Sequence, residues 1–329
     1  MTNQVHWGIL GNAGIARKAL IPAIQRADNA KLYAIASASS NVEQAAREYG
    51  AEQAYTNYEA LLEDPEVDAV YIPLPNGLHA EWVKKAAAAG KHVLCEKPAA
   101  LTAAEAADMV TACERSHVLF MEAFMYRFHP QHEKVRALIA EGAIGEVRTM
   151  RSRFSFTLND AANNIRTNPE LGGGALYDVG CYCIHASRYM LGSEPTHVYA
   201  QARIDGRFGV DMTTSGLLTF ANGVQAAFDC SFEAPDEEFY EVVGSEGRIY
   251  VERPFRPDKT DDGNGRIVVN GETHVIEGDA YKAQVEHFSR CVLEQTEPVH
   301  PGAETVRNMQ VIDACREAMR TGNAVSVSR

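Results

Sequence analysis

Lys97 lies two residues after the apolar run His92–Cys95, a position from which its amine could bind a ligand or take part in catalysis. The run predicts a buried parallel strand, so we expect Lys97 just past the strand's carboxyl end, the edge where open α/β sheets bind ligands. Pro98 restrains the backbone of Lys97 and permits a cis peptide bond. A cation fixed there can orient an alcohol and stabilise oxyanion character. The alternative is a surface lysine whose aliphatic chain packs on the protein while its amine stays in water.

A second cluster follows three consecutive glycines at positions 172–174. Asp178, Tyr182 and His185 are spaced i, i+4 and i+7 in a predicted helix, so they share one face. As catalytic groups they would bring a carboxylate, a phenol and an imidazole to one place. The alternative is a solvated helix edge.

The turn after the first predicted strand, Val5–Leu10, is typical of a phosphate-binding loop. Residues 8–16 follow the G-x-G-x-x-G/A pattern, with alanine in place of the middle glycine and at the last position. Backbone N–H groups at the start of the following helix favour a pyrophosphate. We therefore expect the cofactor to contact Gly11, Asn12, Ala13, Gly14, Ile15 and Ala16. Gly-rich turns also serve simple packing.

The end of the second predicted strand bears on the choice of cofactor. An acidic residue that binds the ribose hydroxyls of NAD is absent from residues 37–41, which read Ser-Ala-Ser-Ser-Asn. Small hydroxyl side chains accept a 2′-phosphate more readily, which favours NADP through Ser37, Ser39 and Ser40. No lysine or arginine stands there, so NAD stays possible, and Ser40 could instead cap a helix.

A proline-framed loop at residues 72–79 ends another strand on the same edge. It could form a wall against the nicotinamide ring or its ribose, through Pro73, Leu74, Asn76 and His79. Alternatively, it is a simple connection with Asn76 as helix cap. Glu96 and Lys97 complete the expected cofactor contacts.

These elements must be positioned by a fold with two parts. Residues 1–122 alternate strand and helix patterns, which predicts an NAD(P)-binding, Rossmann-type, doubly wound parallel sheet. Residues 123–329 read as a substrate-binding α+β domain with a large open, mostly antiparallel sheet, and Asn222-Gly223 and Asn270-Gly271 are hairpin signals. Such a sheet commonly finds a partner, so we expect a homodimer or homotetramer.

Composition excludes several classes of protein. The formal net charge of −13 makes nucleic acid and membrane partners improbable. No apolar run reaches the length of a membrane span, and the first residues lack the pattern of a signal peptide. Seven cysteines without Cys-x-x-Cys pairs favour reduced thiols in the cytoplasm. The acidic runs 236–238 and 261–262 are interpreted as solvated loops.

His129 and His132 could suggest a metal, but Pro130 lies between them and no third ligand is apparent, so we expect no metal site. No G-x-S-x-G nucleophile motif occurs.

Taken together, the turn, the Pro-Asn-x-x-His loop, Glu96-Lys97-Pro98 and the glycine run leading to Asp178 resemble the Gfo/Idh/MocA oxidoreductases over nearly the whole chain. Tyr182 stands where many members have histidine. This and the run 122–130 resemble the branch that contains dimeric dihydrodiol dehydrogenase and NADP-dependent D-xylose dehydrogenase. That branch usually has an arginine after the second strand, and this chain has none there.

The resemblance implies hydride transfer between nicotinamide and a secondary alcohol or ketone of a sugar, polyol or vicinal diol. Lys97, Tyr182 and Asp178 would be catalytic, and either Lys97 or Tyr182 would move the proton. The expected substrate wall consists of Arg127, Phe154 and His185. The alternatives are an NAD-dependent glycosidase that acts by transient oxidation and a non-catalytic dinucleotide sensor.

Overall fold

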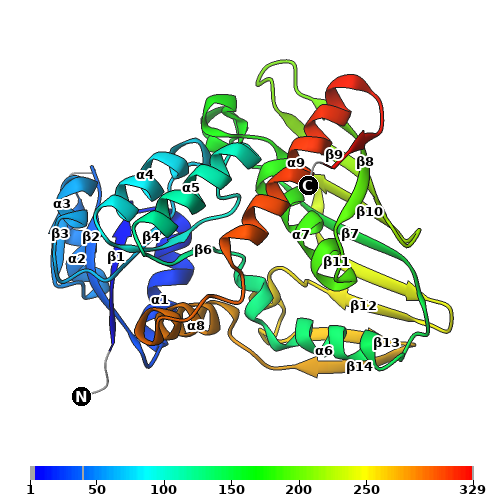
Figure 1. The fold of residues 1–329 in the computed structure, drawn as a ribbon, viewed down its shortest axis with the longest axis horizontal. Coiled ribbons are helices and arrows are strands. Elements are labelled where there is room, and N and C mark those ends of the chain that lie inside the picture. The colour runs from blue at the N-terminus through cyan, green and yellow to red at the C-terminus, as the bar shows by residue number, and fades with distance from the viewer. Residues whose placement is uncertain (1–3, 39–40, 328–329) are drawn as a thin grey trace. The chain divides into compact units, whose positions relative to one another are not determined.

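In the computed structural model, which describes residues 4–38 and 41–327, the chain forms two units, each built around its own sheet (Figure 1). The first unit contains the described residues up to Phe124 together with Ala280–Val306, and the second contains Met125–Asp279 and the residues from Arg307 onward. The sequence-based boundary at 122/123 assigns residues 280–306 to the second domain. They lie in the first unit because the helix there packs on the first strand, where Trp7 Nε1 donates to Ser289 Oγ.

The first unit has six parallel strands in the order β3-β2-β1-β4-β5-β6, the order of a doubly wound dinucleotide-binding sheet. The strands are β1 (Val5–Leu10), β2 (Ala30–Ala36), β3 (Gln53–Tyr55), β4 (Ala69–Ile72), β5 (His92–Cys95) and β6 (Phe120–Glu122). Their near-continuous burial is that of a sheet covered on both faces. The predicted parallel sheet is confirmed; β3 was not predicted.

Helices follow the strands, and α4 and α5 lie side by side (Figure 1). The helices of this unit are α1 (Ile21–Arg26), α2 (Val42–Tyr49), α3 (Tyr58–Leu62), α4 (Asn76–Ala88), α5 (Ala103–Arg115) and α8 (Ala280–Glu294). A π turn, Ala16–Leu20, precedes α1. Pro22 has no N–H to give to the preceding turn, and a π turn is one way for a helix to absorb that loss.

The second unit has a nine-stranded sheet in the order β14-β13-β12-β11-β7-β10-β9-β8-β15. Only β10 and β7 pair in parallel, which confirms the mostly antiparallel sheet. The strands are β7 (Val147–Thr157), β8 (Pro195–Ile204), β9 (Asp211–Phe220), β10 (Gln225–Ser231), β11 (Glu233–Gly244), β12 (Arg248–Glu252), β13 (Gly265–Val269), β14 (Glu272–Ile276) and β15 (Val325–Ser326).

Three helices belong wholly or mainly to this unit. α7 (Cys181–Leu191) packs on β7 and β10, α6 (Pro130–Ala140) lies beside β13, and α9 (Gly302–Thr321) begins in the first unit (Figure 1). The acidic run 236–238 is not a solvated loop. It lies in β11, and Glu238 is 3% exposed because alternate residues of that strand face the covered side of the sheet.

Candidate active site

Four strands of the first unit end in one row. Leu10 pairs with Ala36, and Ile72 pairs with Cys95, while β1 and β4 run in register beside each other. The residues that follow this row are Gly11, Ser37, Pro73 and Glu96-Lys97. Parallel register therefore brings four segments predicted to bind the cofactor to one edge of the sheet.

The turn after β1 fits a dinucleotide pyrophosphate. Gly11 has φ +113°, and a Cβ there would lie 3.1 Å from Leu74 Cδ2. A Cβ at Gly14, where the helix begins, would meet nothing within 4 Å, so the space over the first helical turn is open. Asn12 Oδ1 is buried without a hydrogen-bond partner among the described residues. Open space and N-terminal amides are what a bound phosphate group would use, and the Asn12 oxygen is an acceptor that a cofactor hydroxyl could satisfy. Ser39 and Ser40 lie outside the described residues.

His79 joins two loops of this edge. Its Nε2 lies 2.7 Å from Leu74 O, its Nδ1 lies 3.0 Å from Pro98 O, and the ring is fully buried. Burial lowers the pKa of His79, and the two carbonyl oxygens oppose that shift. Asn76 is the first residue of α4 rather than its cap, because Pro75 occupies the N-cap position. His79 thus fixes the loop that contains Leu74.

The Lys97 backbone is held by carboxylates. The Lys97–Pro98 peptide bond is cis. Glu96 accepts a hydrogen bond from the Tyr71 hydroxyl and another, at 3.3 Å, from the Lys97 amide. Buried Glu122 accepts from the Ala99 amide at 2.9 Å. The segment on both sides of the half-buried Lys97 is therefore fixed by side chains of β4 and β6.

In the second unit, the glycine run makes a close approach to backbone on one side and a carboxylate on the other. A Cβ at Gly173 would lie 2.6 Å from Arg166 O, and one at Gly174 would lie 2.1 Å from Asp211 Oδ1. Neither position can hold a larger residue without movement. The π turn Leu176–Gly180, which carries Asp178, follows directly and leads into α7 with Tyr182 and His185.

Asp178 has a partner that the sequence analysis missed. Arg166, in the loop between β7 and the glycine run, donates from Nε to Asp178 Oδ2 at 2.6 Å. The negative charge of Asp178 raises the pKa of Arg166, and Tyr182 adds to this shift. The hydrogen bond places the guanidinium beside Asp178, one of the predicted catalytic residues of the second unit. No sequence motif pointed to Arg166, since its spacing from Asp178 reflects loop geometry.

Tyr182 lies in an aromatic cluster. Its ring centroid is 5.4 Å from that of Phe154 and 5.3 Å from that of Phe255, and Phe154 stacks on Phe255 at 9°. The Tyr182 hydroxyl donates to Met125 Sδ at 3.7 Å. His185 is 2% exposed and its Nδ1 contacts the Tyr126 hydroxyl, so it belongs to the interior of the unit. The guanidinium of Arg127 lies 4.6 Å from the Tyr189 ring.

The two histidines of the His-x-x-His motif have structural contacts. His129 Nδ1 accepts from the Gln131 amide at the start of α6. His132 contacts the Tyr240 hydroxyl and Pro254 O, and burial lowers its pKa to about 3. No group of three metal-ligating side chains occurs within the described residues.

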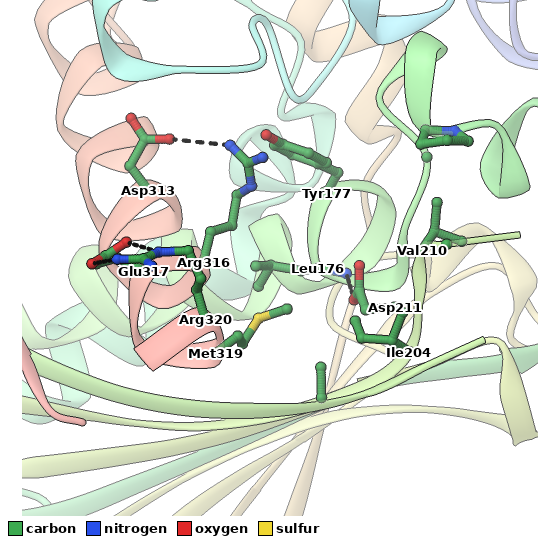
Figure 2. Close-up of a pocket in the computed structure, with 14 residues that line it drawn as sticks. Leu176, Tyr177, Ile204, Val210, Asp211, Asp313, Arg316, Glu317, Met319 and Arg320 are labelled. Atoms are coloured by element: carbon green, nitrogen blue, oxygen red, sulfur yellow. Dashed lines mark hydrogen bonds and ion pairs between the residues drawn. The ribbon is translucent and has the colours of Figure 1, made fainter. Parts of the chain in front are cut away.

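A cavity of about 560 Å³ lies elsewhere in the second unit, walled by the π turn, β8, β9 and α9 (Figure 2). Its arginines are already paired, Arg316 with Asp313 and Arg320 with Glu317. None of the predicted site residues lines it.

The first unit has the architecture of a dinucleotide-binding domain, and the second supplies an open sheet with titratable groups at one end of a helix. Models of two families match these parts: an oxidoreductase family with an NAD-binding Rossmann fold matches residues 5–124, and the GFO/IDH/MocA C-terminal domain matches residues 132–250. The chain belongs to the GFO/IDH/MocA family and is an NAD(P)-dependent oxidoreductase.

Individual relatives extend over the whole chain. D-xylose 1-dehydrogenase (NADP(+)) 2 of Haloferax volcanii is 41% identical over 98% of this chain and 99% of its own. Trans-1,2-dihydrobenzene-1,2-diol dehydrogenase of Mus musculus is 29% identical over 96% of this chain and 97% of its own. The structure of a 3-ketoreductase of Actinomadura kijaniata, solved with NADP and TDP-benzene, matches with a TM-score of 0.91 at 33% identity. The match covers 96% of this chain and 98% of the ketoreductase chain.

Proposed function

We propose that this protein catalyses reversible hydride transfer between NADP and a secondary alcohol or ketone of a sugar, polyol or vicinal diol. When bound, the nicotinamide accepts or donates the hydride. The observation that carries the proposal is the row of strand ends in the first unit, which brings the phosphate-binding turn and Lys97 to one sheet edge. The names of the xylose and dihydrodiol dehydrogenases support this substrate class.

The proposed cofactor site follows that edge. The amides of the first turn hold the pyrophosphate, Asn12 Oδ1 accepts from a hydroxyl of the cofactor, and the hydroxyl of Ser37 faces the ribose end. The choice of NADP is supported by the missing acidic residue after β2 and by the NADP named for two relatives. The remaining contacts are assigned to Gly11, Ala13, Gly14, Ile15, Ala16, Ser39, Ser40, Pro73, Leu74, Asn76, His79, Glu96 and Lys97.

For the proton, we assign Tyr182 as the group that exchanges it with the substrate hydroxyl and Lys97 as the cation that orients the same oxygen. A cation beside the reacting oxygen favours the phenolate, which is the second role assigned to Lys97. Asp178 holds Arg166 rather than acting on the substrate alone. Phe154 and Arg127 form the substrate wall, and His185 supports it through Tyr126.

The test is a panel of aldoses, inositols, ketoses and vicinal diols with NADP and with NAD, followed by absorbance of the reduced nicotinamide. Turnover with a vicinal diol or aldose and NADP supports the proposal. Release of an aglycone from a glycoside without net reduction would identify a glycosidase. Tight NADPH binding without turnover on any member of the panel would identify a sensor.

We also propose that the protein forms homo-oligomers through the open face of the nine-stranded sheet. Tyr199 of β8, which alternates with the buried Val198 and Ala200, is 40% exposed there. Light scattering coupled to size exclusion tests this, and a monomer at micromolar concentration contradicts it.

A cytoplasmic location is consistent with seven free, buried cysteines. Among the described residues, no helix has the length and apolar character of a membrane span.

A further inference from the structure

Arg166 lies beside Asp178 of the candidate site, and no motif of the sequence points to it. Its Nε is committed to Asp178 at 2.6 Å. Within residues 4–38 and 41–327, neither Nη atom donates to a protein acceptor, and the side chain is 39% exposed. A planar guanidinium with one edge fixed and its other N–H groups available is arranged to donate to two adjacent oxygens.

The loop holds Arg166 in place before any ligand binds. Its amide donates to Asn164 Oδ1 at 3.1 Å, and its carbonyl accepts from the Gly174 amide at 2.8 Å. The same carbonyl lies close to Gly173, where a Cβ would come within 2.6 Å of it, so a larger residue there would displace the loop. Because backbone and Nε are both fixed, little conformational entropy is lost when the Nη groups bind.

The position of the guanidinium connects it to the reaction. Arg166 is bonded to Asp178 of the π turn, which runs directly into α7 with Tyr182 four residues further on. The charge of Asp178 offsets that of Arg166. The pair therefore presents N–H donors without a net positive charge, which suits neutral hydroxyl oxygens better than a carboxylate or phosphate.

We infer that Arg166 binds the substrate through its two Nη groups. One donates to the hydroxyl on the carbon next to the reacting carbon, and the other donates to one further hydroxyl. Arg166 therefore selects neutral vicinal diols and sugars. This inference rests on the proposed function and names the residue that sets its substrate class. Arg166 is a binding residue, and Asp178 positions it.

The experiment compares matched substrates with and without the neighbouring hydroxyl: trans-1,2-cyclohexanediol against cyclohexanol, and D-xylose against 2-deoxy-D-xylose. In the wild type, kcat/KM should favour the vicinal member by about 10- to 100-fold. In Arg166→Met that preference should fall to within about threefold, and Arg166→Lys, which keeps the charge but not the fork, should also lose most of it. Arg207→Met, a change at an exposed arginine over the Phe208 ring, should keep the wild-type preference.

A purely structural role for Arg166 predicts a different result: equal loss for both members of each pair together with a lower melting temperature. That result would overturn the inference, as would an unchanged preference in Arg166→Met. Calorimetric titration of the same compounds into NADPH-loaded protein gives a readout without turnover. If the wild type binds the diol more tightly than the alcohol but oxidises neither, the proposed function fails and the inference stands; if it shows no preference in binding or rate, the inference fails.

Discussion

The Asp211 carboxylate accepts a hydrogen bond from the Leu176 amide at 2.7 Å, at the first residue of the π turn that leads to Tyr182 (Figure 2). The same oxygen accepts from Thr214 Oγ1 at 2.6 Å, and the carboxylate lies against Gly174. An anion at a helix N-terminus satisfies free amides and complements the helix dipole. Asp211 therefore ties strand β9 to the start of the helix that carries both proposed catalytic residues of the second unit.

Asp211→Ala should destabilise the protein by about 2–4 kcal/mol, because it leaves the Leu176 amide and the Thr214 hydroxyl buried without an acceptor. Urea unfolding at pH 7 measures this free energy. Asp261→Ala, at an exposed carboxylate, is the control and should change stability by less than about 0.5 kcal/mol. Equal stability of the two variants would show that Asp211 does not hold the helix.

Lys97→Met should lower turnover by about 10²–10⁴-fold, because it removes the cation proposed to orient the reacting oxygen. The affinity for NADPH, measured by fluorescence titration, should change little, since the hydrogen bonds from Tyr71 to the Glu96 carboxylate and from the Ala99 amide to Glu122 still fix this loop. Lys31→Met, at a surface ion pair with Glu52, controls for loss of a positive charge. Wild-type turnover in Lys97→Met would eliminate the proposed mechanism.

Tyr182→Phe should fold normally but lack the hydroxyl that is proposed to exchange a proton with the substrate. The ring contacts with Phe154 and Phe255 are retained, and the hydroxyl gives up a weak sulfur acceptor, Met125 Sδ. Turnover should fall by about 10²–10³-fold, and the pH-dependent limb of kcat that belongs to the phenol should disappear. If that limb persists in Tyr182→Phe and vanishes in Lys97→Met instead, the lysine transfers the proton.

The sequence predicted most of the elements because their signals are local. The hairpin signals within residues 123–329 pointed to a mostly antiparallel sheet, and Gly50 ends α2 with φ +71°, as a helix-terminating glycine should. The parallel sheet could be predicted because an alternation of strands and helices with short loops favours crossover connections. The short β3 and α3 were missed, since three to five residues carry too little periodicity to be recognised.

The sequence located site residues only where they directly follow the end of a predicted strand. Lys97 and the turn at Gly11 could be placed from strand ends alone. Arg166 could not, because its ion pair with Asp178 depends on the path of an irregular loop. Glu238 was misjudged for a related reason: an acidic triplet is usually solvated, but strand alternation buries one of its members.

Glu238 makes stability fall as pH rises. Its carboxylate oxygens lack hydrogen bonds among the described residues, Arg253 Nη1 is 3.8 Å away, and burial raises the pKa of Glu238 to about 7 from 4.5. The folded state thus binds this proton more tightly than the unfolded state does. The resulting stabilisation is complete below pH 4.5 and is lost between about pH 4.5 and 7, amounting to about 3 kcal/mol.

Glu238→Gln removes this titration while keeping the shape of the protonated acid. The variant should equal the wild type near pH 4.5 and exceed it by about 3 kcal/mol at pH 8, in urea unfolding across that range. His132, whose pKa is lowered to about 3, destabilises the fold as pH falls from 6.5, but it does so in both proteins and cancels in the difference. Glu237→Gln, at the neighbouring half-exposed carboxylate paired with Arg153, is the matched control. A variant-minus-wild-type difference that stays flat from pH 4.5 to 8 would mean that Glu238 ionises in the folded protein as it does in the unfolded chain.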